Sequence, residues 1–76
     1  MKLPARITLD PAVMGGRPCI RGTRVTVGLI VGMLGQSHDR AEILRLYPYL
    51  ESDDIHAALT YAAWRADKQK FPVTRG

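Results

Sequence analysis

The segment Gly15–Arg24, with the sequence GGRPCIRGTR, limits the possible folds of this 76-residue chain more than any other stretch. A regular helix cannot run through it, because Pro18 lacks an amide hydrogen and its ring pushes the preceding residue out of the helical region. Its three glycines permit backbone angles that other residues avoid. Arg17, Arg21 and Arg24 give it a dense positive charge. We therefore predict that this segment, here called the arginine loop, is an ordered loop that serves as a binding surface.

The length and the charge of the chain restrict its class. A chain of 76 residues forms one domain. It buries only about 60% of its unfolded surface, so dimerisation would add stability. The net charge of +4 favours polyanions or acidic protein surfaces as partners. This charge is unevenly spread: residues 1–24 carry +4, residues 25–50 are balanced, residues 51–67 carry −3 and residues 68–76 carry +3.

The cysteine content and the longest apolar run bear on where the protein works. Cys19 is the only cysteine, so no internal disulfide can form. Together with the lack of a signal-like N-terminus, this indicates a cytoplasmic protein. The apolar run from Val25 to Gly35 is about half the length that a transmembrane helix needs, so we expect no membrane contact.

Two short segments have the composition of β-strands. Arg6–Leu9 alternates in character and is rich in β-branched residues, and Asp10-Pro11 ends it. Arg24–Val27 is a second candidate strand, and the two could pair. Because a pair this short is not stable alone, it must pack on helices or on a second subunit.

The apolar segment from Val27 to Leu34 fits a buried strand or a buried helix. Three observations favour the helix: Thr26 can serve as its N-cap, Gly35 stands where a left-handed C-cap residue would fall, and apolar residues recur at helical spacing. Whether the segment starts as a strand stays open. The residues at that spacing are Val27, Ile30, Val31 and Leu34, whereas Gly28 and Gly32 would share another face.

A second helix is predicted from Ser37, its N-cap, to about Tyr47, where Pro48 stops it. Asp39 in its first turn suits the helix dipole. The residues predicted to face inward are Ala41, Ile43 and Leu44.

A third helix is predicted after Ser52, its N-cap, with Asp53 and Asp54 in the first turn. Its apolar residues form two stripes on nearly opposite sides. The second stripe either wraps around the edge of the core or forms a subunit or partner interface, and the pattern leaves both open. The first stripe comprises Ile55, Ala58, Leu59, Ala62, Ala63 and Ala66, and the second comprises Ala57, Tyr61, Trp64 and Lys68.

The residue types that carry catalysis or bind metals are not spaced for either task. His38 and His56 have no partner histidine or cysteine at metal-ligand spacing. One cysteine and scattered acids define no catalytic triad, and helix N-termini recruit acids such as Asp53 and Asp54 for electrostatic reasons. The glycines form no phosphate-binding loop with its lysine. We therefore expect neither an enzyme nor a bound metal or cofactor.

Three helices joined by short turns indicate a mainly α bundle of the helix-turn-helix type, with a short N-terminal β element. In a homeodomain-like arrangement the third helix would enter a DNA groove, but Asp53 and Asp54 at its start would repel phosphates. The arginine loop and the second helix are better placed by charge. The alternative is that these arginines form surface salt bridges or bind loop carbonyls. The candidate DNA-binding residues are Arg17, Arg21, Arg24, Arg40 and Arg45.

One longer pattern runs through most of the chain, from about Ile7 to Ala63. It comprises Asp10-Pro11, the string from Gly16 to Val25, Glu42-Ile43-Leu44, Tyr47-Pro48-Tyr49-Leu50, Asp54-Ile55, Ala57-Ala58-Leu59 and Tyr61-Ala62. With this pattern the sequence closely resembles the bacterial and archaeal family called domain of unknown function 433. The resemblance implies a homeodomain-like, three-helix fold with a short β element.

The resemblance also implies a function, that of an antitoxin in a type II toxin–antitoxin pair. Such VapB-like proteins are paired with a PIN-like ribonuclease toxin, which they neutralise, and they bind the promoter of their own operon. The expected partners are therefore the cognate toxin, promoter DNA and a second copy of the chain in a homodimer.

The division of the chain suits these two tasks. We predict one helix-turn-helix-like domain over residues 1–68 and a basic, flexible tail over residues 69–76. PIN-type nucleases hold Mg²⁺ with clustered carboxylates, and a lysine or arginine that reached this cluster would compensate its charge. The candidate toxin-binding residues are Tyr61, Trp64, Lys68, Lys70, Phe71, Val73 and Arg75.

A second function fits the same residues. The chain would be a homodimeric protein-interaction module that binds no DNA, and its arginines would stabilise the loop or a contact between subunits.

Overall fold

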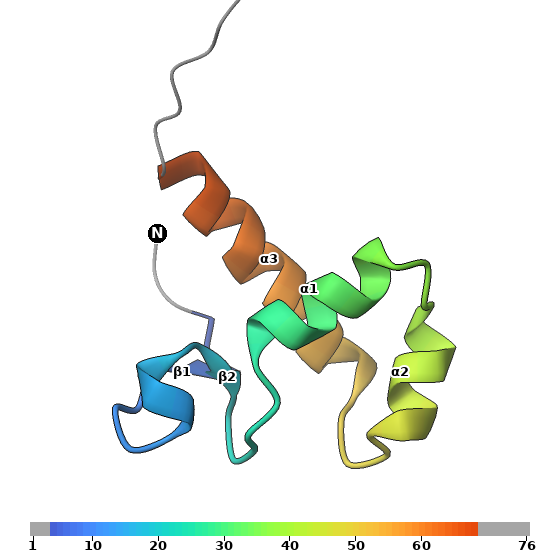
Figure 1. Ribbon diagram of the computed structural model, residues 1–76, viewed down its shortest axis with the longest axis horizontal. Helices are drawn as coiled ribbons and strands as arrows, with labels where there is room; N and C mark the ends of the chain where they lie inside the picture. The colour runs from blue at the N-terminus through green and yellow to red at the C-terminus, as the bar shows by residue number, and fades with distance from the viewer. Residues whose placement is uncertain (1–3, 69–76) are drawn as a thin grey trace, which may run out of the picture.

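Three helices and a two-stranded sheet make up residues 4–68, the part of the chain that the computed structural model describes (Figure 1). The prediction of a mainly α fold with a short N-terminal β element is confirmed. The tail over residues 69–76 lies outside the described residues, so the boundary at residue 68 stays a prediction. The elements are β1 (Ile7–Thr8), the 3₁₀ turn η1 (Met14–Gly16), β2 (Cys19–Ile20), α1 (Val27–Gly35), α2 (Arg40–Leu46) and α3 (Ser52–Lys68).

The sheet pairs β1 with a strand inside the arginine loop. Ile7 lies opposite Ile20 in an antiparallel ladder, within the first segment that we predicted as a strand. The second predicted strand, Arg24–Val27, is wrong, because Thr26 forms only an isolated bridge and Val27 already starts α1. The physical reason is a tight reversal after β2, in which the Ile20 amide donates to the Val25 carbonyl at 2.9 Å. This turn leaves too little chain for a further strand before the helix.

The apolar segment after this turn is helical, as its spacing favoured. The hydroxyl of Thr26 accepts a hydrogen bond from the Leu29 amide at 3.0 Å, so the predicted N-cap is confirmed. The predicted C-cap at Gly35 is wrong, since Gly35 lies inside α1 and the left-handed residue is Ser37, with φ of 74°. The amide of His38 donates to the Met33 carbonyl at 3.0 Å, which closes the helix end as a Schellman motif.

The caps of the other two helices differ from the prediction by one or two residues. Because Ser37 is left-handed, it cannot cap α2; Asp39 does so, and its carboxylate accepts from the Glu42 amide at 2.8 Å. Ser52 is already the first helical residue of α3. The carboxylate of Asp54 instead accepts from the Glu51 amide at 2.8 Å, which is the reach-back half of a capping box.

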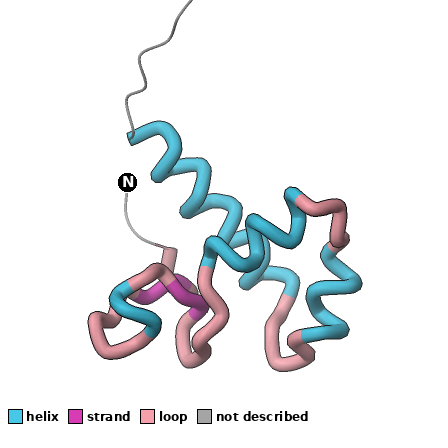
Figure 2. Tube along the Cα trace, viewed as in Figure 1, coloured by secondary structure: helices cyan, strands magenta, loops and turns pink. Residues whose placement is uncertain are grey.

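The core lies where α1 crosses α3, with α2 and the sheet packed beside them (Figures 1 and 2). Each helix contributes one fully buried isoleucine, namely Ile30, Ile43 and Ile55. Burying a side chain of this size stabilises a fold by roughly 1.5–3 kcal/mol. On α2, Ile43 is buried and Leu44 is half-buried. Ala41 is exposed, so its predicted inward position is wrong.

Both apolar stripes of α3 enter this core over their first turns. Tyr61, on the second stripe, is only 6% exposed, and Ala57 is buried with it. The reason is that both α1 and the sheet pack on α3. Further along the helix, Ala63 and Ala66 of the first stripe are exposed. For Tyr61 the structure therefore supports the reading in which the second stripe wraps around the core. None of the helices described here combines the length and the apolar composition that crossing a bilayer would take.

Candidate nucleic-acid interface

The arginine loop is ordered by backbone geometry on both sides of β2. Before the strand, Gly15 and Gly16 have φ of 67° and 84°, which L side chains rarely adopt. After the strand, Gly22 has φ of 78° and lets the chain reverse. Thr23 then locks the turn, since its hydroxyl donates to the Ile20 carbonyl at 2.8 Å and accepts from the Val25 amide at 3.0 Å. The loop therefore presents its side chains from a fixed frame.

Three guanidinium groups project from this frame into solvent. Arg17, Arg21 and Arg24 are all exposed. Within residues 4–68 carboxylates pair with Arg6 and with His38, and none pairs with these three arginines. Arg21 does donate one hydrogen bond to the Ala5 carbonyl at 3.2 Å. Of the alternatives raised for these arginines, salt bridges are therefore not observed in the described residues, and carbonyl binding is observed for Arg21 alone.

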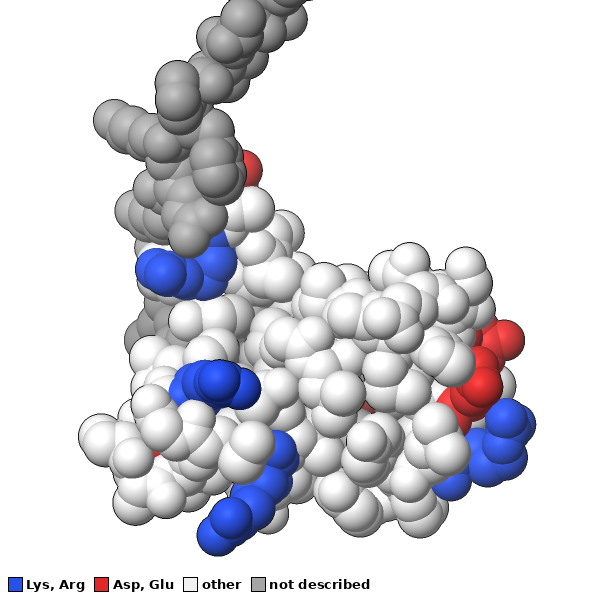
Figure 3. Space-filling model, in the orientation of Figure 1, with Lys and Arg blue, Asp and Glu red and all other residues white. Residues whose placement is uncertain are grey.

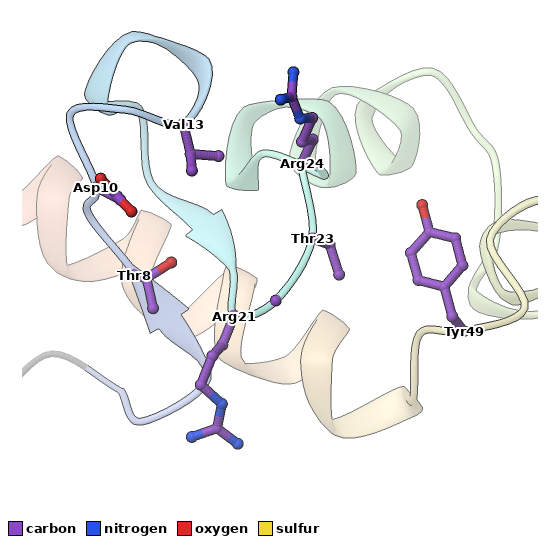
Figure 4. Close-up of a pocket in the computed structure, with 8 residues that line it drawn as sticks. Thr8, Asp10, Val13, Arg21, Thr23, Arg24 and Tyr49 are labelled. Carbon is purple, nitrogen blue, oxygen red and sulfur yellow. The ribbon is translucent and has the colours of Figure 1, made fainter.

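An open groove lies along the second half of the loop (Figure 4). The segment 21–24 runs between Thr8, Asp10 and Val13 on one side and the ring of Tyr49 on the other. The guanidinium groups of Arg21 and Arg24 point to opposite sides of the view. Tyr49 was absent from the predicted site, because only the folded chain brings the connector between α2 and α3 beside the loop.

The acidic start of α3 has its own basic partner, which the sequence did not reveal. The guanidinium of Arg6, just before β1, lies 2.7 Å from Glu51, 2.9 Å from Asp54 and 3.7 Å from Asp53. Asp54 is only 7% exposed and also accepts from the Glu51 amide. The hydrogen bonds that Arg6 donates to Glu51 and, as the second cause, to Asp54 raise the pKa of Arg6 above its ordinary value. The four side chains fasten the sheet to α3.

The two arginines predicted on the second helix lie apart from the loop in sequence and fold. Arg40 and Arg45 belong to α2, and both are exposed. A nitrogen of Arg40 lies 3.4 Å from the carbonyl and hydroxyl oxygens of Ser52. Figure 3 shows basic side chains in separate groups, over the β element with its loops and beside α2, with an uncharged surface over α1 between them. The five candidate arginines are therefore not one continuous patch on this face.

The predicted toxin-binding residues are distributed over the core, the end of α3 and the tail. Tyr61 is buried, and Trp64 is half-buried with its ring centroid 5.8 Å from that of Tyr61. Lys68 is the last residue of α3. The remaining candidates, Lys70, Phe71, Val73 and Arg75, lie outside the described residues.

Other reactive side chains in the described part of the chain are not grouped into a site. The thiol of Cys19 is buried in β2, with its sulfur 3.4 Å from the Arg17 carbonyl oxygen. His38 pairs with Glu42 at 2.9 Å on α2. Among residues 4–68, no three His, Cys, Asp or Glu side chains are placed together as a metal ion would require.

These features define a small, mainly helical domain whose sheet carries a basic loop with guanidinium groups that have no carboxylate partner within residues 4–68. Residues 7–62 match the model of the family described as protein of unknown function (DUF433). The chain belongs to this family, which confirms the resemblance noted in its sequence.

Two similar proteins were found, and both are longer than this chain. The chain is 34% identical over 56 residues to the uncharacterized protein y4eO of Sinorhizobium fredii strain NGR234, a match that covers 74% of this chain and 25% of that protein. It is also similar to the crystal structure of a DUF433 member from Anabaena variabilis, with a TM-score of 0.78 and 33% identity over 83% of this chain and 62% of the other. The chain thus spans about a quarter of the first protein and less than two thirds of the second.

Proposed function

We propose that this protein is the antitoxin of a type II toxin–antitoxin pair, which neutralises a PIN-like ribonuclease and binds the promoter of its own operon. The observation that carries the proposal is the set of exposed guanidinium groups on Arg17, Arg21 and Arg24, which have no carboxylate partner within residues 4–68. A charge that the fold leaves uncompensated is available to a polyanion.

Two further features support DNA binding by the loop. The acids at the start of α3 are paired with Arg6, which directly precedes β1. They are therefore held in place and do not lie against the loop arginines. Three helices joined by short turns also suit a homeodomain-like, helix-turn-helix type of domain. In a homodimer two copies of the arginine loop, supplemented by Arg40 and Arg45 of α2, would reach two half-sites of a pseudo-palindromic promoter in the cytoplasm.

The toxin would bind at the far end of α3. Trp64 offers a half-buried ring there, and Lys68 continues into the basic tail. A PIN-like nuclease gathers carboxylates around Mg²⁺, so a cationic side chain that enters this site compensates its charge. Within the tail, Phe71 and Val73 would anchor the segment, and Lys70 or Arg75 would approach the acidic site.

Co-expression with the neighbouring reading frame tests the proposal. We expect a small nuclease to co-purify, its ribonuclease activity to be suppressed, and the complex to shift a duplex that contains the upstream region of the operon. Truncation after Asp67 should leave the domain folded, because the buried side chains of the described residues lie between Ile7 and Tyr61. The same truncation should weaken inhibition. Unchanged inhibition would refute the role of the tail, and the lack of any co-purifying nuclease would refute the antitoxin role.

A second candidate function is favoured by α1. This helix contains no charged residue, yet Leu29 is 40% exposed and Gly32 has no neighbouring atom within 4 Å of a Cβ position. Such a face suits a homodimeric interaction module that binds no DNA. This function predicts a dimer that dissociates in Leu29→Asp and no gel shift with the upstream duplex, whereas the antitoxin predicts the shift.

A further inference from the structure

We infer that the groove between Tyr49 and the turn after β1 binds an unpaired nucleotide, so the arginine loop recognises single-stranded nucleic acid in addition to the promoter duplex. The inference rests on the nucleic-acid binding proposed for this loop and names the form of the ligand. It draws on side chains that come together only in the folded chain, from β1 and its following turn, from the arginine loop, and from the connector between α2 and α3.

The aromatic ring of Tyr49 lines one side of the groove. Tyr49 is 62% exposed, although its neighbour Tyr47 is half-buried against the core. The two rings meet edge to face, with centroids 6.3 Å apart and planes inclined by 74°. This contact orients the Tyr49 ring without a second ring stacked in parallel over it. An oriented, exposed ring beside cationic groups is the platform on which unpaired bases stack, because every base has a flat π face.

Two positively charged side chains line the groove. The guanidinium groups of Arg21 and Arg24 point away from each other, at the two ends of the segment that forms the base of the groove (Figure 4). Arg21 donates one hydrogen bond to the Ala5 carbonyl, and its other N–H donors are available to an anion. A single strand that crosses the groove would meet one guanidinium before and one after the nucleotide that occupies it. Successive phosphates of such a strand carry the negative charge that both guanidinium groups would bind.

The centre of the groove suits a base better than a phosphate. The carboxylate of Asp10 faces it and would repel a phosphate, whereas exocyclic amino groups of bases are hydrogen-bond donors that a carboxylate accepts. One oxygen of Asp10 accepts from the Ala12 amide at 2.9 Å, so the side chain is held in position. Between the arginines, Gly22 contributes no side chain to the base of the groove, and nothing lies within 4 Å of its Cβ position. A flat ring can therefore approach the backbone there.

Fluorescence anisotropy with labelled oligonucleotides tests the inference. The probes are a DNA strand and an RNA strand of about 12 nucleotides, a length within the usual range of single-strand site sizes, the matching duplex, and a DNA strand of the same length in which every nucleotide is abasic. We expect wild-type protein to bind the single strands more tightly than the matching duplex. The abasic strand should bind about tenfold more weakly than the complete DNA strand, since one stacked base is lost. The DNA and RNA arms identify which strand the groove accepts.

The variants separate stacking from charge. Tyr49→Ala should weaken binding of the complete single strand by about tenfold and leave binding of the abasic strand unchanged, whereas Tyr49→Phe should bind like wild type. Arg65→Ala, which removes an equal charge from an exposed position of α3 outside the groove lining, is the matched control for Arg24→Ala. Thermal unfolding followed by circular dichroism checks that each variant is folded, and the comparison of abasic and complete strands on wild-type protein needs no variant at all.

Three results would overturn the inference. If wild-type protein binds the abasic strand as tightly as the complete strand, no base stacks in the groove. If Tyr49→Ala binds both strands like wild type while the upstream duplex still shifts, the inference is wrong and the proposed function stands. If neither single strands nor duplex bind, the DNA-binding half of the proposed function fails together with the inference, and co-purification of the toxin then decides the other half.

Discussion

The start of α3 and the arginine loop both concentrate charge, and the fold treats the two regions in opposite ways. At the start of α3, each acidic side chain lies within 4 Å of Arg6, and Asp54 is nearly buried. In the arginine loop, no guanidinium has a carboxylate partner within residues 4–68, and the loop is held by glycine turns and the hydroxyl of Thr23. The first region uses charge to fasten the sheet to a helix, whereas the second keeps its charge available for a ligand.

The largest expected effect on stability is at the start of α3, where the acids pair with Arg6. Asp54→Ala removes the acceptor for both Arg6 and the Glu51 amide, so we expect the free energy of unfolding to fall by about 2 kcal/mol. For a domain of this size the melting temperature should fall by roughly 10 °C. Urea unfolding at neutral pH measures the loss. The matched control is Asp53→Ala, whose side chain is 80% exposed and should change stability by less than about 0.5 kcal/mol; equal losses in the two variants would contradict this assignment.

The next largest effect on stability is expected at Gly22, in the turn that holds the arginine loop. Gly22→Ala places a side chain at φ of 78°, and we expect it to destabilise the protein by about 1 kcal/mol through backbone strain. Gly32→Ala is the control with the same added methyl group. It lies inside α1 with open space around it, so the change should stabilise the helix by roughly 0.5–1 kcal/mol. Chemical denaturation of both variants should give changes of opposite sign, and a common sign would refute the assignment of strain to Gly22.

A smaller effect is expected when the charges of the loop are removed. Arg17→Ala combined with Arg24→Ala deletes two guanidinium groups that have no carboxylate partner in the described residues, so stability should stay within about 0.5 kcal/mol of wild type. Thermal unfolding at low salt is the appropriate measurement, because like-charge repulsion is then least screened. A loss comparable to that of Asp54→Ala would mean that these arginines have a structural task.

The smallest effect is expected from a change of pH, which should leave the contribution of Arg6 to stability unchanged. The raised pKa of Arg6 means that its contribution to stability is fully present below the unfolded pKa and is lost only when pH rises through the still higher folded value. Between about pH 7 and about pH 9, both well below the ordinary pKa of arginine, the stability difference between wild type and Arg6→Met should therefore be constant. Urea titrations at these two pH values check it, and a difference that shrinks toward alkaline pH would contradict the assignment.

The sequence predicted the helical elements well, since local patterns determine them. The spacing from Val27 to Leu34 and the threonine before it were sufficient for α1, and the acids near Ser52 located the start of α3 to within a residue. The cap of α2 was misplaced because Ser37 and Asp39 are both capping residues. Only the reversal after α1, which puts Ser37 in a left-handed conformation, selects the second.

The site was predicted less completely, because tertiary contacts assemble it. The arginines of the loop were identified from their density, but the strand Cys19–Ile20 among them depends on the turn at Gly22. The partner of Asp54 lies 48 residues earlier in the chain, and no local pattern links the two. Tyr49 was known only as a connector residue until the fold placed its ring beside the loop.

The central claim is that the exposed arginines of the loop contact nucleic acid, and the salt dependence of binding tests it most directly. The logarithm of the association constant for the upstream duplex is measured against the logarithm of salt concentration, for wild type and for Arg21→Ala combined with Arg24→Ala. Each lost phosphate contact lowers the slope by about 0.9 in magnitude, so we predict a decrease of about 2 for the double variant. Identical slopes for the two proteins would show that these arginines do not touch phosphate and would contradict the claim.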